Sequence, residues 1–149
     1  MGETGFWRVS TDGGAPERVT AKLYSGPEVS PDGQWLAYTF VDNAAGRRAR
    51  FAIAPANGVE GEPSKVFDYA VPSAAGLEWT PDGSGLSYAA ASAGVGQIWV
   101  QPVAGGAPKQ ITAFRNSTIN SFRWSPDGKQ IVLSRGNTSS DAVLIRQKN

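Results

Sequence analysis

Ser125-Pro126-Asp127-Gly128 is one of three nearly identical four-residue turns in this chain, and their repetition decides the fold. The other copies are Ser30-Pro31-Asp32-Gly33 and Thr80-Pro81-Asp82-Gly83, so successive prolines are 50 and 45 residues apart. Proline presets φ at the first corner of such a turn, aspartate accepts hydrogen bonds from nearby backbone N–H groups, and glycine adopts the left-handed conformation before the next strand. We therefore predict three equivalent hairpin corners. Their structural residues are Pro31, Asp32, Gly33, Pro81, Asp82, Gly83, Pro126, Asp127 and Gly128.

A second motif repeats out of phase with these turns. Residues 6–20 align without a gap with residues 98–112, a separation of 92, and both contain a Gly-Gly-Ala-Pro turn. A looser copy covers residues 51–67, and a partial copy covers residues 142–147. Each repeating unit therefore consists of four short apolar strands joined by turns. This pattern predicts an all-β sandwich, barrel or propeller, and no helical periodicity persists between the turns.

The composition excludes several kinds of site. The chain has neither histidine nor cysteine among its 149 residues, so it cannot build a Ser-His-Asp triad, a His-ligated zinc site, a thiolate nucleophile or a disulfide. Its 14 basic and 13 acidic residues nearly balance, so no nucleic-acid partner is expected. The one basic run, formed by Arg47, Arg48 and Arg50, is expected to be a solvated loop.

No motif for catalysis or for a cofactor accompanies the repeats. Asp32, Asp82 and Asp127 are the obvious acids, but their place in equivalent turns explains them as turn residues. The chain contains no G-x-S-x-G elbow, no calcium loop of the D-x-[DN]-x-[DN]-G type and none of the protein-kinase signatures. We therefore expect no catalytic residue, no cofactor and no metal, and we predict that the chain is not an enzyme.

No membrane contact is expected from this segment itself. The most apolar stretch, residues 86–100, is interrupted by glycine and serine and is too short to span a bilayer. The first residues, MGETGFWR, lack the charged and apolar regions of a signal peptide. The residues alone therefore leave the compartment open.

The Ser/Thr-Pro-Asp-Gly turn after an apolar-x-Trp strand, together with an IWV strand followed by a Gly-Gly turn, resembles the TolB-like or PD40 repeat, a relative of the WD40 repeat. The resemblance covers nearly the whole chain and implies a β-propeller of four-stranded antiparallel blades. Residues 111–147 are similar to the C-terminal propeller part of bacterial transmembrane serine/threonine kinases or winged-helix regulators. The family resemblance favours a periplasmic or extracytoplasmic location.

The strands amount to about three and a quarter blades, whereas closed propellers have about four to eight. We expect a single propeller segment over residues 1–149, with a part-blade at 5–20, blades at 25–67 and 73–112, and a part-blade at 119–147. Three explanations stay open: a fragment of a larger propeller, copies that associate to complete one ring, or an open curved stack. The free sheet edges of an arc favour self-association.

Tryptophans recur at equivalent positions of the repeat. Trp79 and Trp124 each stand two residues before a turn proline, and Trp7 matches Trp99 in the second motif. Large aromatic side chains at repeated positions bury much apolar area between neighbouring sheets. We therefore expect these tryptophans to pack between blades and not to bind a ligand.

In propellers, the connections from one blade to the next line one mouth of the central channel. By this analogy the candidate binding loops hold Tyr24, Glu28, Asp68, Tyr69, Phe114, Arg115 and Asn116, beside Lys22 and Pro72. Aromatic and arginine side chains in loops suit recognition of a protein or peptide. We predict a non-enzymatic segment that binds a protein, peptide or ligand as the sensing or scaffolding part of a larger bacterial protein. The alternatives are an accessory propeller of an enzyme, either a kinase receptor or a prolyl-oligopeptidase-type peptidase, and a self-assembling repeat fragment.

Overall fold

The structure is a computed structural model that describes residues 5–20, 25–42, 46, 48–57, 63–67 and 76–137. All regular structure in these ranges is β-strand, arranged in four antiparallel sheets. Accordingly, no helix that could cross a membrane occurs in the described part of the chain. The predicted all-β fold with four-stranded antiparallel sheets is confirmed.

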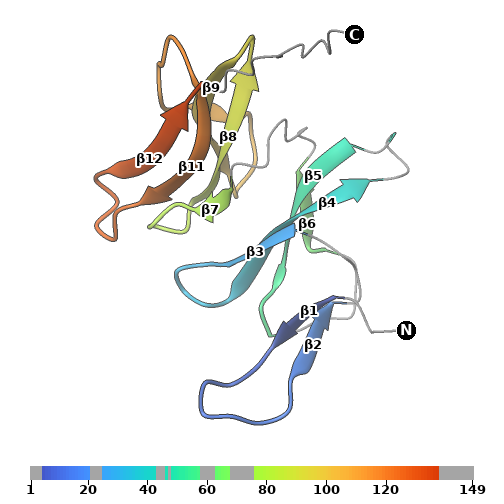
Figure 1. Cartoon of the computed structure of the whole chain (residues 1–149). Helices are drawn as coiled ribbons and strands as arrows, with labels where there is room; N and C mark the ends of the chain where they lie inside the picture. The colour runs from blue at the N-terminus through green and yellow to red at the C-terminus, as the bar shows by residue number, and fades with distance from the viewer. Residues whose placement is uncertain are drawn as a thin grey trace, which may run out of the picture.

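The four sheets follow one another around an arc, with a two-stranded sheet at each end (Figure 1). The first sheet pairs β1 (Phe6–Arg8) with β2 (Glu17–Thr20), and the last pairs β11 (Thr118–Trp124) with β12 (Ile131–Gly136). The second sheet has the order β3 (Ser25–Val29), β4 (Trp35–Asp42), β5 (Arg48–Pro55) and β6 (Lys65–Phe67). The third has the order β7 (Leu77–Trp79), β8 (Gly85–Ser92), β9 (Val95–Pro102) and β10 (Lys109–Gln110). The further strand predicted over residues 142–147 lies outside the described residues.

The three Ser/Thr-Pro-Asp-Gly turns have the same hydrogen bonds. In the first, the Ser30 hydroxyl donates to Asp32 Oδ1 at 2.5 Å, and the same oxygen accepts the backbone N–H of Gln34 at 3.0 Å. The corresponding hydroxyl-to-carboxylate distance is 2.6 Å in each of the other two turns. The fourth residue of each turn has a φ of 72°, 70° and 69° at Gly33, Gly83 and Gly128, a left-handed conformation that favours glycine. The three turns therefore share one backbone geometry and one pattern of hydrogen bonds.

These hydrogen bonds stabilise the ionised form of each turn carboxylate. The pKa values of Asp32, Asp82 and Asp127 are lowered, first by the hydroxyl that donates to each carboxyl and second by the backbone N–H two residues later. The three aspartates are thus structural acids whose charge the turn itself accommodates.

Replacing the three aspartates together (Asp32→Asn, Asp82→Asn and Asp127→Asn) should remove a charge-dependent part of the stability. Because folding lowers each pKa, the contribution is fully present above the unfolded pKa of about 3.9 and is lost as pH falls through the folded value. We expect the variant to melt at a lower temperature than the parent at neutral pH, with a difference that shrinks below about pH 3. Thermal melts followed by circular dichroism test this, and equal melting temperatures at neutral pH would contradict it.

Each pair of neighbouring sheets encloses its own apolar cluster. Between the second and third sheets, the rings of Phe51 and Tyr88 lie 4.8 Å apart between centroids, and both residues are fully buried. A second cluster joins the third and last sheets through Ile98 and Phe122. A third joins the first and second sheets and includes Tyr38. Stability therefore comes from contacts between neighbours along the arc, as in other repeat folds.

Of the four tryptophans at repeated positions, Trp79, Trp99 and Trp124 pack between sheets and Trp7 does not. Trp79 is 8% exposed and its indole N–H donates to the carbonyl of Glu28 on the preceding sheet at 3.0 Å. Trp124 also donates to the preceding sheet, but to a side chain, the Ser87 hydroxyl, at 2.8 Å. Trp7, in contrast, remains 45% exposed, because the described residues place no sheet against that face of β1 and β2.

Candidate functional site

The first strands of three successive sheets, β3, β7 and β11, converge on the inner edge of the arc. Arg123 Nη1 on β11 lies 3.9 Å from Glu28 Oε1 on β3, although the third sheet stands between these two strands. Glu78 on β7 forms an ion pair with Arg123 and also accepts the backbone N–H of Trp124 at 3.2 Å. The three strands therefore meet around one group, the inner charge cluster of Glu28, Glu78 and Arg123.

The members of the inner charge cluster differ greatly in burial. The side chain of Glu78 is 7% exposed, that of Glu28 is 35% exposed and that of Arg123 is 73% exposed. Burial raises the pKa of Glu28; Arg123 opposes this shift and Glu78 adds to it. The hydrogen bond with Glu78 raises the pKa of Arg123. Two carboxylates share one guanidinium here, so the cluster ties three sheets together and contains one more carboxylate than guanidinium.

The structure corrects the predicted position of Glu28. It lies in β3, where it pairs with Ala37, and not in a connecting loop. Glu78 and Arg123 were not identified from the sequence, yet a signal for them exists. All three charged residues stand two positions before the serine or threonine that begins a turn. An alignment of the three turns that included polar positions would have shown them as one repeated site.

The connection between β10 and β11, residues 111–117, is held in place by Gln97 on β9. The Gln97 amide N–H donates to the Phe114 carbonyl at 2.7 Å, and its Oε1 accepts the Phe114 backbone N–H at 3.0 Å. The same oxygen accepts the Thr112 hydroxyl at 2.8 Å. One side chain thus satisfies both backbone groups of Phe114 and fixes the path of the loop.

Arg135 on β12 holds the other side of this loop. Its guanidinium lies 4.3 Å above the centre of the Phe114 ring, within the range of a cation–π contact. It also donates to the carbonyl of Asn116 at 3.0 Å and to the side-chain oxygen of Asn116. Phe114 packs inward against the cluster between the third and last sheets, whereas Arg115 is exposed. Of these three predicted binding residues, Arg115 and Asn116 are exposed, and Asn116 is held by Arg135.

The other predicted binding loops cannot be compared in the same way. Tyr24, Asp68 and Tyr69 lie outside the described residues, as do Lys22 and Pro72. The structure thus brings Phe114, Arg115 and Asn116 together in one ordered loop, while the proposed mouth formed by several loops stays a prediction.

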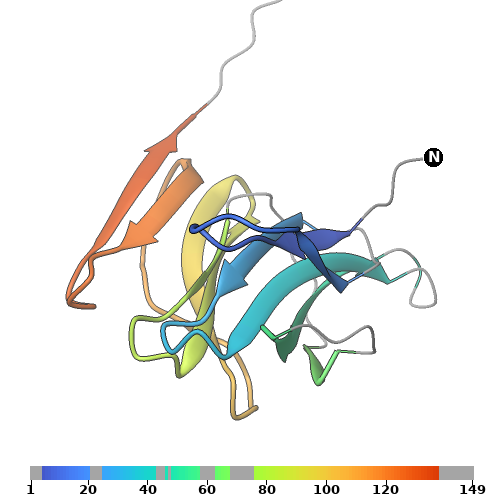
Figure 2. The same cartoon turned by 90° about the horizontal axis from the view of Figure 1, so that it is seen from below.

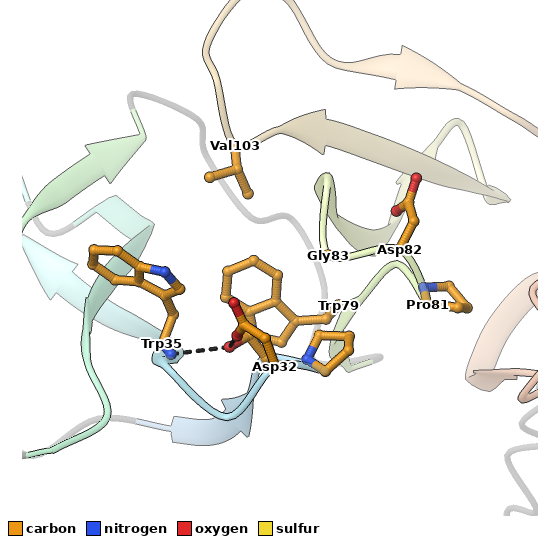
Figure 3. A pocket seen from close by; sticks show the side chains of 9 residues that line it. Asp32, Trp35, Trp79, Pro81, Asp82, Gly83 and Val103 are labelled. Atoms are coloured by element: carbon orange, nitrogen blue, oxygen red, sulfur yellow. Dashed lines mark hydrogen bonds between the residues drawn. The ribbon is translucent and has the colours of Figure 1, made fainter.

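A shallow pocket lies at the opposite end of the sheets from that loop, between the first two turns (Figure 3). It has a volume of about 210 Å³, and Trp79 contributes to its wall together with Trp35 and Val103. Its two carboxylates, Asp32 and Asp82, already accept hydrogen bonds within their own turns. Pockets for small ligands usually measure about 300–1,000 Å³, so this hollow is better explained by the packing of one turn beside the next. Within the described ranges, no three acidic side chains gather into a metal-binding group.

Comparison with known proteins gives a fold class for this arrangement of blades. No family model matches the chain, and no curated protein matches its sequence. The fold is that of a β-propeller: a solved TolB structure from Agrobacterium tumefaciens superposes with a TM-score of 0.70 at 22% identity, over 88% of this chain and 45% of that chain. A TolB structure from Acinetobacter baumannii aligns with a TM-score of 0.43 at 20% identity, over 91% of this chain and 44% of that one.

The more specific resemblance is to TolB. The chain has a TolB-like propeller fold, which confirms the fold implied by the repeated turns. It spans less than half the length of the solved TolB proteins that it matches. The chain is therefore a partial propeller, and the similarity to kinase-linked or regulator-linked propellers stays a prediction.

Proposed function

We propose that this chain is a non-catalytic binding module, a propeller arc that recognises a protein or peptide as the sensing or scaffolding part of a larger bacterial protein. The absence of histidine and cysteine from the sequence supports this proposal, since it removes the commonest general base and the most reactive side-chain nucleophile. The turn aspartates support it as well, because their carboxylates are engaged within their own turns.

The observation that carries the proposal is the fixed loop around Phe114. Gln97 and Arg135 hold this loop from two sides, and between the two anchored positions Arg115 is exposed. An arginine whose backbone is already ordered loses less freedom on binding than one on a mobile loop. Its planar guanidinium matches a carboxylate in two parallel hydrogen bonds. The partner that fits is a peptide segment with an exposed carboxylate, from aspartate, glutamate or a chain terminus.

A phage-displayed library of random peptides, selected on the immobilised full chain, tests this function. We expect enrichment of peptides rich in aspartate or glutamate. For a synthesised winner, Arg115→Ala should weaken binding by about tenfold, which corresponds to about 1.4 kcal/mol. Lys129→Ala is the matched control, because Lys129 is an exposed cation in the turn at the other end of the last sheet and should leave the affinity unchanged.

Three results would overturn the proposal. The first is the absence of any enriched peptide, and the second is an affinity that is indifferent to Arg115→Ala. The third is turnover of ester, peptide or phosphoester substrates by the purified chain at a rate above background, which would establish an enzyme.

A further inference from the structure

The two-stranded sheets at the ends of the arc correspond to two different halves of a complete sheet. β1 and β2 have the same cross-strand pairs as β9 and β10, the outer two strands of the third sheet. Equivalent residues are 92 positions apart in the sequence. Trp7 pairs with Arg18 and Arg8 with Glu17, as Trp99 pairs with Gln110 and Val100 with Lys109. The turns agree as well, since Gly13 N–H donates to Ser10 O and Gly105 N–H donates to Pro102 O, both at 3.1 Å.

β11 and β12 repeat the inner half of a sheet, β7 and β8, with a shift of 45. Arg123 pairs with Val132 and Trp124 with Ile131, as Glu78 pairs with Ser87 and Trp79 with Leu86. Among the described residues, the last sheet thus has the first two strands of a blade, and the first sheet has the last two. Together the two pairs would make one four-stranded blade.

The strand edges at which these halves would join are free in the described part of the chain. In the third sheet, β8 and β9 join the inner and outer halves in an antiparallel ladder. Among the described residues, β12 pairs only with β11 and β1 pairs only with β2. Unpaired edges of this kind expose backbone N–H and C=O groups that readily pair with another strand.

The β8–β9 ladder predicts the register of the missing pairing. Leu86 pairs with Gln101, Ser87 with Val100 and Tyr88 with Trp99. Shifting β8 by 45 and β9 by 92 places Ile131 opposite Val9, Val132 opposite Arg8, and Leu133 opposite Trp7. This register puts two apolar cross-strand pairs on one face, an arrangement that stabilises antiparallel sheets.

The exposed side chains of the end sheets agree with this register. Trp7 is 45% exposed and Val9 is 61% exposed, whereas the equivalent Trp99 packs against the cluster between the second and third sheets. In a completed blade Trp7 would take the place of Trp99, beside Leu133 and against the third sheet. Val132, which is 69% exposed, would gain Arg8 as its neighbour across the ladder.

One chain cannot make this pairing with itself. β1 and β12 belong to the sheets at opposite ends of the arc, and two complete sheets stand between them (Figures 1 and 2). A β1 strand that pairs with β12 would therefore belong to another molecule, and the strand predicted over residues 142–147 is the competing occupant of this edge. A second copy fits by length, since one chain covers 45% of the solved TolB chain that it matches and two copies would cover about twice that share.

We propose that two copies of this chain close one ring, in which β12 of each copy pairs antiparallel with β1 of the other in the register Val132 opposite Arg8. The interface repeats the β8–β9 ladder and adds two composite blades to the two complete blades that each copy contains. A head-to-tail contact of this kind gives a closed ring when the rotation that relates successive copies leads back to the first copy. It gives a filament when that rotation does not close.

Engineered cysteines test the pairing directly, because the chain has no cysteine of its own. The full chain with Arg8→Cys and Val132→Cys should form a covalent dimer under mild oxidation, and non-reducing electrophoresis should show no higher species. The matched control combines Arg8→Cys with Lys129→Cys, which lies in the turn between β11 and β12, and should stay uncrosslinked. Failure of the first pair to cross-link, or equal cross-linking of both pairs, would overturn the proposal. A ladder of larger species would overturn closure.

A second variant tests the interface without a cross-link. Trp7→Glu places a charge where the composite blade buries an indole, so the dimer dissociation constant should rise at least about thirtyfold. Val41→Glu, at an exposed apolar position of β4 (53% exposed), should leave it unchanged. Both variants should keep the parent's circular dichroism spectrum. A Trp7→Glu dimer as tight as the parent would overturn the proposal, and so would a monomeric parent, whose β12 edge would then have another occupant such as the strand predicted over residues 142–147.

Discussion

Gly96→Ala is expected to separate the last sheet from the third and to lower the free energy of unfolding by roughly 3 kcal/mol. A Cβ atom at Gly96 would lie 2.7 Å from the backbone nitrogen of Ile119 and 3.3 Å from the backbone carbon of Thr118. Neither atom belongs to a flexible side chain, so the two strands themselves must move apart. Their movement would also break the hydrogen bond of 2.9 Å from Gly96 N–H to the Ser117 carbonyl.

Gly136→Ala is the matched control for this variant. Gly136 also lies at the end of a strand, and a Cβ atom there would have no neighbour within 4 Å. Its effect should be within about 0.5 kcal/mol, as for most surface substitutions. Urea denaturation followed by tryptophan fluorescence measures both variants. Equal stability of the two would contradict the close approach of β9 and β11.

Arg123→Met is expected to lower the free energy of unfolding by about 2 kcal/mol, the typical worth of a hydrogen bond to a charged group. The substitution leaves the carboxylate of Glu78, which is 7% exposed, without its guanidinium. The cost should be smaller than that of breaking a fully buried ion pair, about 3–5 kcal/mol, because the Arg123 side chain is 73% exposed and water can replace part of its contact.

A surface pair provides the comparison for Arg123→Met. Arg8 and Glu17 form an ion pair at 2.6 Å with side chains 48% and 65% exposed, and Arg8→Met should cost at most about 1 kcal/mol. Adding Glu78→Gln to Arg123→Met should recover part of the loss, since a neutral amide is easier to bury than an unpaired carboxylate. Denaturant titrations of the four variants give the coupling energy. An Arg123→Met variant as stable as Arg8→Met would contradict a role for the inner charge cluster in joining the sheets.

The turns and the blade repeat could be predicted from the sequence because their causes are local. Pro126, Asp127 and Gly128 set the backbone of their own turn, and the same chemistry recurs at two other positions. The correspondence between the first sheet, β1–β2, and the strands β9–β10, with a shift of 92, was also visible as a gapless alignment.

The candidate site was harder to predict because it depends on contacts between blades. The ion pair of Glu78 with Arg123 joins residues 45 positions apart, and only the curvature of the arc brings their strands together. Phe114 was expected in a binding loop, and its ring packs inward because Gln97 and Arg135 hold it there. No sequence signal marks Gln97, since a single glutamine on a strand normally faces solvent.

The solution mass of the full chain is the most direct test of the central claim, that the sheets at the two ends of the arc are halves of one blade joined between copies. Size-exclusion chromatography with multi-angle light scattering over a dilution series measures this mass. We expect a species with the mass of two chains of 15.7 kDa each. That species should dissociate more readily when it carries Trp7→Glu. A mass of one chain at every concentration would contradict the claim, and would leave peptide binding through Arg115 to be judged by its own experiment.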